Sequence, residues 1–330
     1  MIEKIDFVVT WVNGNDPVWK KSKTMFATDS ENQIMNSDAR YRDWEFMKYW
    51  FRAVEQNAPW VNKIFLITEG HIPEWLDLSC EKLVHIRHKD YIDEKYLPTF
   101  NSNVIELNIS NIGDLSEYFV LFNDDMLINK SVRPEDFFED SNPRDTGIFS
   151  PIVPSRGTIG SIVLNNVEII NDYFNARQVI KKNFFKFFNL KYGKHLIKNF
   201  CVLPWKSILG FYDSHIPVSY KKSTFYMVWE KEKELLEETS SHKFRTNQDI
   251  NHSLMRYWQL CQGKFITIKE SFGKYYNIYS DLTVIVEDIK FSKHSLICLN
   301  DGEVDNFEES KKVILQAFQD RYPNKSMFEK

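Results

Sequence analysis

An α/β fold with a central, mostly parallel sheet flanked by helices is predicted by three features of the sequence. In the first half of the chain, short apolar runs typical of buried strands alternate with amphipathic stretches typical of helices. The chain has 330 residues, enough to bury a sizeable core. Hydrophobic residues make up 43% and charged residues 27%, which is ordinary for a soluble globular protein.

The charge and the cysteines exclude several classes of protein. A formal net charge of -4 gives no reason to expect nucleic acid binding. None of the four cysteines forms a CxxC pair, so neither a zinc knuckle nor a disulfide framework is indicated. No apolar stretch is long enough to span a bilayer, and the first residues are typical of a strand rather than a signal peptide. We therefore expect a cytoplasmic protein.

The first strand is predicted at Ile5–Val12, a run rich in β-branched and aromatic residues. A loop with Asn13 and Gly14 follows, and a strand before a glycine-containing loop often opens a nucleotide-binding fold. Asp16 lies in the same loop and has two interpretations. It could face a ribose or base, or it could cap a helix that starts at Pro17, since proline suits the first helical position.

The first long amphipathic helix is predicted at Trp44–Gln56, where apolar residues recur at helical spacing. Asp43 directly before it is the expected N-cap. Arg40 and Arg42 precede this helix and could contact an anion near its N-terminus, or they could form surface ion pairs. Strands are then expected at Lys63–Thr68 and Lys82–His88, before a helix near Asn103–Ser110 with Ser102 as its cap.

The stretch Leu115–Asn129 is the most informative part of the chain. Its apolar run, Tyr118–Phe122, predicts a buried strand that ends at Asn123, Asp124 and Asp125. Adjacent carboxylates repel each other, and a divalent cation between them and a diphosphate offsets that repulsion. Ligands of open α/β sheets bind beyond the carboxyl ends of the strands, so we predict a metal–nucleotide site here. The alternative is a plain turn, because Asn and Asp are common turn residues.

The second half of the chain is expected to be more helical, with one further strand at Thr146–Val153. Lys181–Phe200 is rich in Lys and aromatic residues and contains no acidic residue. It could touch anionic lipid or a polyanionic acceptor, or it could be a solvated helix with its aromatic residues in the core. Further helices are predicted at Glu230–Glu238, Phe244–Gln259 and Phe307–Tyr322.

Five stretches of this sequence, in the same order, resemble the conserved regions of the Stealth family. These are bacterial capsular and cell-wall polysaccharide phosphotransferases, related to the catalytic subunit of the eukaryotic lysosomal-enzyme GlcNAc-1-phosphotransferase. The resemblance runs from Ile5 to Glu329 and is weakest at Gly157–Leu209. The matching stretches are IDFVVTWVNGNDPVW, RYRDWEFMKYWFRAVEQNAPWVNKIFLIT, LPTFNSNVIE with LSEYFVLFNDDMLI, KFRTNQDINHSLMRYWQ, and CLNDGE through RYPNKSMFE.

The resemblance implies one catalytic domain over residues 1–330 with a GT-A or Rossmann-like fold. Residues 1–153 would form the nucleotide-sugar half, 154–240 a variable acceptor-side segment, and 241–330 a helical part that completes the site. The implied reaction moves a hexose- or N-acetylhexosamine-1-phosphate from a UDP-sugar to a hydroxyl of a growing polysaccharide or lipid-linked oligosaccharide. Attack falls on the β-phosphorus and releases UMP, so the sugar keeps its anomeric configuration and the product is a phosphodiester.

The resemblance also implies roles for residues at the reacting centre. Asp124 and Asp125 would hold Mg2+ or Mn2+, with Asn123 assisting. Arg245 would bind the transferred phosphate, because a guanidinium offers a planar fork to two oxygens. His215, in a His-x-Pro element, is the expected base for the acceptor hydroxyl, and Asp249 is a secondary catalytic candidate.

The remaining expected site residues would bind the nucleotide sugar. Asn13 stands where many family members have Asp, so it is not expected to be a primary metal ligand. The set consists of Thr10, Trp11, Val12, Asn13, Gly14, Asp16, Arg40, Arg42, Asn101 and Ser102.

Two other functions are consistent with the same motifs. A metal-dependent retaining glycosyltransferase would use Asp124 and Asp125 in the same way but would release UDP. A non-catalytic polysaccharide-assembly protein would need none of these side chains for turnover. For an enzyme of the implied kind we expect a location in the cytoplasm, with peripheral contact to the inner face of the cell membrane through residues 181–200.

Overall fold

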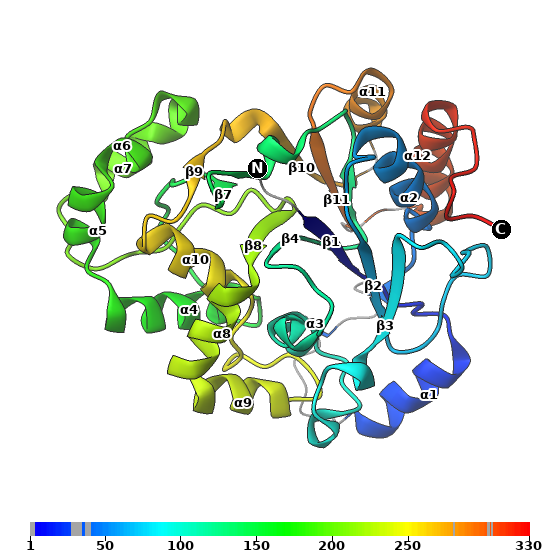
Figure 1. Ribbon diagram of the computed structural model, residues 1–330, viewed down its shortest axis with the longest axis horizontal. Coiled ribbons are helices and arrows are strands. Elements are labelled where there is room, and N and C mark those ends of the chain that lie inside the picture. Colours follow the sequence, from blue (N-terminus) through cyan, green and yellow to red (C-terminus); the bar gives the residue numbers. More distant parts are fainter. Residues whose placement is uncertain (1–3, 28–34, 37–40, 280, 302–303, 305) are drawn as a thin grey trace.

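The computed structural model describes residues 4–27, 35–36, 41–279, 281–301, 304 and 306–330. Its centre is a five-stranded sheet in the order β3-β2-β1-β4-β8 (Figure 1). Four of these strands run parallel and β8 runs antiparallel to β4, so the predicted mostly parallel sheet is confirmed. The strands are β1 (Ile5–Thr10), β2 (Ile64–Thr68), β3 (Leu83–Arg87), β4 (Tyr118–Phe122) and β8 (Val218–Lys221).

Helices cover both faces of this sheet, which explains why its strands are apolar on both sides. Within β1, Phe7 and Val9 pack into one core cluster and Val8 packs into the other, as alternation along a strand requires. The first cluster lies under α2 (Met47–Asn57), α11 (Thr283–Phe291) and α12 (Phe307–Arg321). The second lies under α3 (Ser102–Leu107), α4 (Gly160–Tyr173), α8 (Lys222–Lys231), α9 (Lys233–Ser241) and α10 (Ser253–Cys261).

Two small sheets stand beside the central one. The first has the order β10-β11-β5 and consists of β10 (Gly273–Asn277), β11 (Leu296–Asn300) and β5 (Met126–Ile128). The second has the order β6-β7-β9 and consists of β6 (Phe138–Glu139), β7 (Asn142–Asp145) and β9 (Ile266–Thr267). The chain passes from β4 into β5 through Asn123, Asp124 and Asp125, so the acid pair lies where the central sheet meets a second sheet.

A lobe of short helices extends away from the central sheet (Figure 1). It contains α5 (Ala176–Lys182), α6 (Phe184–Phe187), the 3-10 segment η6 (Leu190–His195) and α7 (Leu196–Cys201). In the described part of the chain, no helix is long and apolar enough to cross a membrane. The remaining elements are α1 (Pro17–Phe26) and the 3-10 segments η2 (His88–Asp90), η3 (Glu94–Tyr96), η4 (Ile109–Asn111), η5 (Pro134–Asp136) and η7 (Glu270–Phe272).

Two of the helix caps predicted in the first half, Asp43 and Ser102, are wrong. The Asp43 carboxylate accepts the N–H of Glu45 in a turn, with an N···O distance of 2.7 Å, and Glu45 has a φ of 60° that a helix cannot include. Helix α2 therefore starts only at Met47. Helix α3 is capped by Asn101 rather than Ser102, because the Asn101 side chain accepts the N–H of Asn103.

The strand predicted at Thr146–Val153 does not form, apart from one isolated bridge at Phe149. Its backbone groups bond partly to the main chain of residues 209–212 and partly to side chains of the helical lobe. The hydroxyl of Tyr192 accepts the N–H of Gly147 at 2.8 Å, and the Asn199 side chain bonds both the Phe149 N–H and the Gly147 carbonyl oxygen. Backbone groups that are already satisfied have no need of a sheet partner.

Candidate active site

The register of β8 brings His215 to the acid pair. Strand β8 pairs antiparallel with β4, with Val218 opposite Leu121. The loop before β8 therefore meets the turn that follows β4. As a result, ligand atoms of Asp125, His215 and Cys298 all lie within 4.8 Å of one another. The structure thus joins the expected base from the second half of the chain to the expected metal ligand from the first half.

Cys298 and Tyr275 complete this cluster, and neither was expected from the sequence. Strand β11 pairs antiparallel with β5 and places Cys298 opposite Met126, so its thiol reaches the Asp125 carboxylate at 3.4 Å. Tyr275 is the partner of Cys298 in β10, and its ring centroid lies 5.4 Å from that of His215. Cys298 begins CLNDGE, one of the stretches that resemble the family, and that signal could have pointed to it; the strand of Tyr275 carries no such signal.

Burial and mutual repulsion destabilise the charged forms of the two acids. Burial raises the pKa of Asp124 to about 8, and the charges of Asp125 and Asp43 add to the effect. Burial also raises the pKa of Asp125, although His215 and Cys298 oppose that shift. Among the described residues, the buried Oδ1 atom of Asp125 has no hydrogen-bond partner. These carboxylates fit a hard divalent cation such as Mg2+ or Mn2+, which prefers oxygen ligands to a thiol.

His215 is held in an unusual backbone conformation. Its φ of 48° lies in the left-handed region, which costs free energy for a residue other than glycine. The His215 N–H donates to Asp213 at 2.8 Å, and Nδ1 lies 3.7 Å from the second Asp213 oxygen. Burial alone would lower the pKa of His215, but Asp213 and, more weakly, Asp125 raise it above the ordinary value. With Nδ1 facing a carboxylate, Nε2 is the nitrogen suited to accept a proton.

A buried ion pair supports the loop that carries His215. The guanidinium of Arg256 donates two hydrogen bonds of 2.8 Å to Asp145 and a third, of 3.1 Å, to the carbonyl oxygen of Tyr212. Arg256 is 5% exposed. Because Tyr212 stands three residues before His215, this ion pair fixes the start of the catalytic loop.

We expect Arg256→Ala to lower the free energy of unfolding by about 3–5 kcal/mol, because it leaves the buried Asp145 carboxylate unpaired. Urea denaturation of the purified protein measures this change. Arg87→Ala is the matched control, since Arg87 forms a similar two-bond ion pair with Asp90 on the surface. Its unfolding midpoint should stay close to that of the native protein. Equal losses in both variants would contradict the structural role of Arg256.

A second cluster holds Arg245. Its guanidinium donates to the Ser102 hydroxyl at 2.5 Å and forms no ion pair within the described residues. Ser102 begins α3, the helix that connects β3 to β4 and therefore starts at the carboxyl edge of the sheet. No contact joins Arg245 to Asp125 or His215 in the parts of the chain that the structure describes.

Asp249, the secondary catalytic candidate, is fully buried and lies at the centre of a hydrogen-bond network. A catalytic role for it stays a prediction. Its carboxylate accepts hydrogen bonds from Asn101 at 2.7 Å, Asn103 at 3.0 Å and the Thr246 hydroxyl at 2.8 Å. These bonds also explain why residues 244–252 are a loop and α10 starts only at Ser253. The network ties the loop of Arg245 to the start of α3.

The loop after β1 lies close to this second cluster. Thr10 and Val12 are half-buried, and Val12 packs against the cluster of Trp19, Phe100 and Phe244, the last of which precedes Arg245. Trp11 is buried and meets the His71 ring edge-on, with the ring centroids 5.3 Å apart. The N–H of Asn13 donates to the same histidine at 2.8 Å. Contact of Trp11 with the nucleotide stays a prediction.

Gly14 and Asp16 have local structural roles. A Cβ atom on Gly14 would lie 1.8 Å from the carbonyl oxygen of Tyr41, so only glycine fits this position. The Asp16 carboxylate accepts the N–H of Trp19 at 2.7 Å and caps α1, which confirms the capping interpretation. Contact of Asp16 with a ribose stays a prediction.

Of the two arginines before α2, Arg42 forms an ion pair within the protein. Arg42 donates two hydrogen bonds of 2.8 Å to Asp301, so its ion-pair interpretation is confirmed. That pair connects the first half of the chain to the C-terminal part. Arg40 lies outside the described residues. Binding of the nucleotide sugar by either arginine stays a prediction.

Comparison with known proteins agrees with the motif order. The profile of Stealth protein CR1, conserved region 1, matches residues 3–31, and that of Stealth protein CR2, conserved region 2, matches residues 40–145. A crystal structure of the galactosyltransferase LgtC with donor and acceptor sugar analogues is similar at a TM-score of 0.38 and 10% identity, covering 94% of this chain and 95% of that one. A likeness this distant says nothing about activity.

Full-length relatives are far more similar. The capsular polysaccharide phosphotransferase WcwK of Streptococcus pneumoniae is 56% identical over 100% of this chain and 99% of its own length. The receptor polysaccharide phosphotransferase WefC of Streptococcus oralis is 41% identical over 99% of this chain and 100% of its own. The exopolysaccharide phosphotransferase cps2G of Lactiplantibacillus plantarum is 41% identical over 99% and 96%. The chain therefore belongs to the Stealth family.

Proposed function

We propose that this protein transfers a hexose- or N-acetylhexosamine-1-phosphate from a UDP-sugar to a hydroxyl of a growing capsular or cell-wall polysaccharide, or of a lipid-linked oligosaccharide. One observation carries the proposal: His215, a residue suited to deprotonate a hydroxyl, lies against Asp125 of the acid pair. This place is at the carboxyl edge of the parallel strands, where α/β folds bind ligands. The relatives' names, all polysaccharide phosphotransferases, support the phosphotransfer.

In the proposed reaction, His215 accepts the proton of the acceptor hydroxyl as that oxygen attacks the β-phosphorus of the donor. The bond from the β-phosphorus to the bridging oxygen breaks, and UMP leaves with that oxygen and its electron pair. The bond between the sugar C1 and its oxygen stays intact. The Asp213 carboxylate beside Nδ1 stabilises the imidazolium that forms. Arg245 offers its guanidinium to the transferred phosphate, since within the described residues this group bonds only the Ser102 hydroxyl.

Asp124 and Asp125 would hold Mg2+ or Mn2+, with Asn123 assisting from the same turn. When bound, such an ion would neutralise charge on the diphosphate of the donor. The half-buried loop after β1, from Thr10 to Gly14, would form the uridine side. Asn101 would act there only through the backbone of α3, since its side chain is buried and bonded to Asp249.

A screen of UDP-sugars against a matching acceptor preparation tests the proposal. We expect one donor to yield UMP in amounts equal to the sugar transferred. Release of UDP would instead show a retaining glycosyltransferase, which would use the same acid pair. No nucleotide release from any donor would favour a non-catalytic assembly protein.

We further propose that the helical lobe touches the inner face of the cell membrane. The solvated-helix interpretation is right for part of the segment, since Phe187 and Tyr192 are buried. Other apolar side chains of the lobe are open to solvent: Phe185 is 82%, Leu190 89% and Ile197 67% exposed. Exposed aromatic and aliphatic residues among lysines are typical of a segment that lies in a membrane interface.

We expect the double variant Phe185→Ser/Leu190→Ser to bind vesicles containing phosphatidylglycerol at least about tenfold more weakly than the native protein, because two exposed apolar side chains are removed from the contact. Vesicle co-sedimentation measures this affinity. Val18→Ser/Phe291→Ser is the control, since these side chains are 78% and 72% exposed but lie outside the lobe. Equal binding by both double variants would contradict membrane contact through the lobe.

A further inference from the structure

A basic cavity lies beside the candidate active site. Its volume is about 430 Å³. Five of its lining residues are cationic and one is acidic, and they come from distant parts of the chain. The cations are Lys130, Arg144, Lys191, Lys269 and Lys293, and the acid is Asp136. A cavity with this excess of positive charge favours an anionic ligand.

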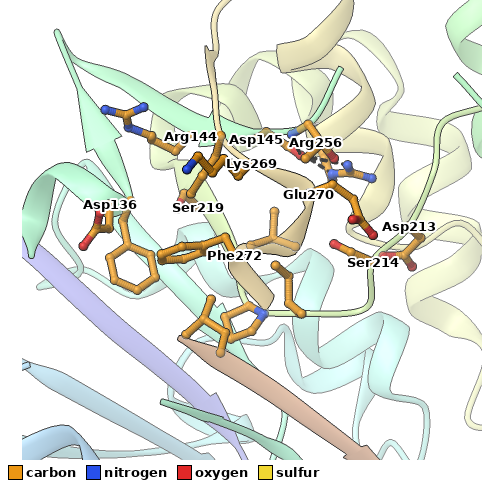
Figure 2. A pocket seen from close by; sticks show the side chains of 17 residues that line it. Asp136, Arg144, Asp145, Asp213, Ser214, Ser219, Arg256, Lys269, Glu270 and Phe272 are labelled. Atoms are coloured by element: carbon orange, nitrogen blue, oxygen red, sulfur yellow. Dashed lines mark hydrogen bonds and ion pairs between the residues drawn. The ribbon is translucent and has the colours of Figure 1, made fainter. Parts of the chain in front are cut away.

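A narrower cleft of about 40 Å³ connects this cavity to the loop of His215. The cleft shares Arg144, Lys269 and Phe272 with the basic cavity, and its other end is lined by Asp213 and Ser214. Figure 2 shows Arg144 and Lys269 near each other, and Asp213 and Ser214 together beyond Glu270. The cleft and the cavity therefore have wall residues in common, and the far side of the cleft is formed by the loop that carries His215, while His215 itself lines neither.

Two of the cations are not engaged by the protein itself. Lys130 and Lys269 are exposed, and within the described residues neither ammonium group has a hydrogen-bond or ion-pair partner. Lys130 follows β5 and Lys269 precedes η7, so the two come from opposite ends of the sequence to one cavity. Ammonium groups gathered without a counter-ion repel each other, and a bound anion would relieve that repulsion.

The other three cations are anchored, which gives the cavity fixed walls. Arg144 forms an ion pair with Glu139, and Lys293 forms one with Glu287 at 2.6 Å. The Lys191 ammonium donates to a main-chain carbonyl oxygen at 2.9 Å. The two glutamates offset the charges of Arg144 and Lys293. The positive potential of the cavity therefore comes from Lys191 and from Lys130 and Lys269, and the last two are free to contact a ligand directly.

The backbone around the cavity is also tied together. The N–H of Ser295 donates to the carbonyl oxygen of Phe272 at 3.1 Å, and the Asn129 N–H donates to the carbonyl oxygen of Ser295 at 2.8 Å. Asn129 directly precedes Lys130, so three segments of the wall are joined by two hydrogen bonds. A cavity with walls fixed in this way loses little freedom when a ligand binds.

We propose that this cavity binds a phosphate-ester anion that is part of the acceptor. The inference rests on the proposed function, whose product is itself a phosphodiester. A growing polysaccharide would carry such a group from an earlier transfer, and a lipid-linked oligosaccharide would carry a diphosphate. The cavity lies on the side of the loop that carries the proposed base. Because the base acts on the acceptor hydroxyl, an anion bound on this side belongs to the acceptor rather than to the donor.

Calorimetric binding without nucleotide or divalent metal tests this site directly. The probes are a glycerol phosphate hexamer, which is a chain of phosphodiesters, geranyl diphosphate, and neutral maltohexaose. We expect at least one charged probe to bind the native protein, and Lys130→Ala/Lys269→Ala to weaken that binding by about tenfold or more. The charged probe that binds more tightly identifies the source of the anion.

Lys89→Ala/Lys312→Ala is the matched control, because both lysines are exposed and neither lines the cavity. It should bind the charged probes as the native protein does. The proposal is overturned if neither charged probe binds, or if the cavity variant binds as tightly as the control. Binding needs no UDP-sugar, so this result is independent of whether UMP is released.

Transfer kinetics separate the acceptor side from the donor side. The cavity variant should raise the KM for a phosphate-bearing acceptor by about tenfold and leave the KM for the UDP-sugar unchanged. A raised KM for the donor alone would place the anion site on the donor side and overturn the proposal.

Discussion

His215→Asn is expected to lower kcat by about 10²–10⁴-fold, the usual contribution of a general base. Asn is chosen because it tolerates the left-handed backbone that His215 adopts, with a φ of 48°, better than most residues. The fold should therefore survive, as an unchanged cooperative melting transition would show. His215→Ala should lose as much activity. Full activity in either variant would remove His215 as the base.

The pH dependence of kcat/KM distinguishes a role of His215 as a base from a purely structural role. A base works only when unprotonated, so activity should fall as the pH drops below the pKa of His215, which Asp213 holds above its ordinary value. Asp213→Asn removes the charge that raises this pKa. The acid limb of the profile should therefore move to lower pH in that variant. A limb that stays in place would contradict the pairing of Asp213 with His215.

Asp124→Asn and Asp125→Asn are each expected to lower kcat by at least about 10³-fold, since several kcal/mol of charge stabilisation depend on a bound cation. Exhaustive chelation should have the same effect on the native protein. Asp114→Asn, an exposed carboxylate away from the site, is the control and should stay active. Full activity after chelation would contradict the metal role of the pair.

The acid pair also predicts how the free energy of unfolding depends on pH, which can be measured without an activity assay. Because the pKa of Asp124 is raised to about 8 in the folded state, its ionisation opposes folding. In chelator, this penalty should be absent below about pH 4, grow as the pH rises to about 8, and stay constant above. Asp124→Asn should flatten that decline, and added Mg2+ or Mn2+ should raise the melting temperature of the native protein at pH 8. A melting temperature that neither added metal nor Asp124→Asn changes would contradict a metal site at this pair.

The central sheet could be predicted because its strands are buried on both faces. Runs such as Phe65–Ile67 are apolar at every position, and such runs leave little choice of structure. The caps failed for a local reason: Asp43 and Ser102 are good capping residues, but neighbouring groups gave the backbone other partners. The helix predicted at Phe244–Gln259 was too long at its start for a similar reason. Its apolar spacing extends through residues 244–252, but hydrogen bonds to the buried Asp249 hold these residues in a loop.

The site was only partly predictable, since much of it depends on strand register. Asp124 and Asp125 follow an apolar run and can be found from the sequence. Their approach to His215 depends on the pairing of Val218 with Leu121, which no local pattern encodes. Resemblance to the family named His215, but not its neighbour Cys298, whose position is set by pairing across a second sheet.

The measurement that tests phosphotransfer most directly follows the β-phosphate of the donor. A UDP-sugar labelled with ³²P at that position, of the sugar that supports UMP release, is incubated with acceptor, and the products are separated. We predict that the label stays in the sugar product and that the released UMP is unlabelled. Label found in released UDP, with an unlabelled glycan product, would contradict the account.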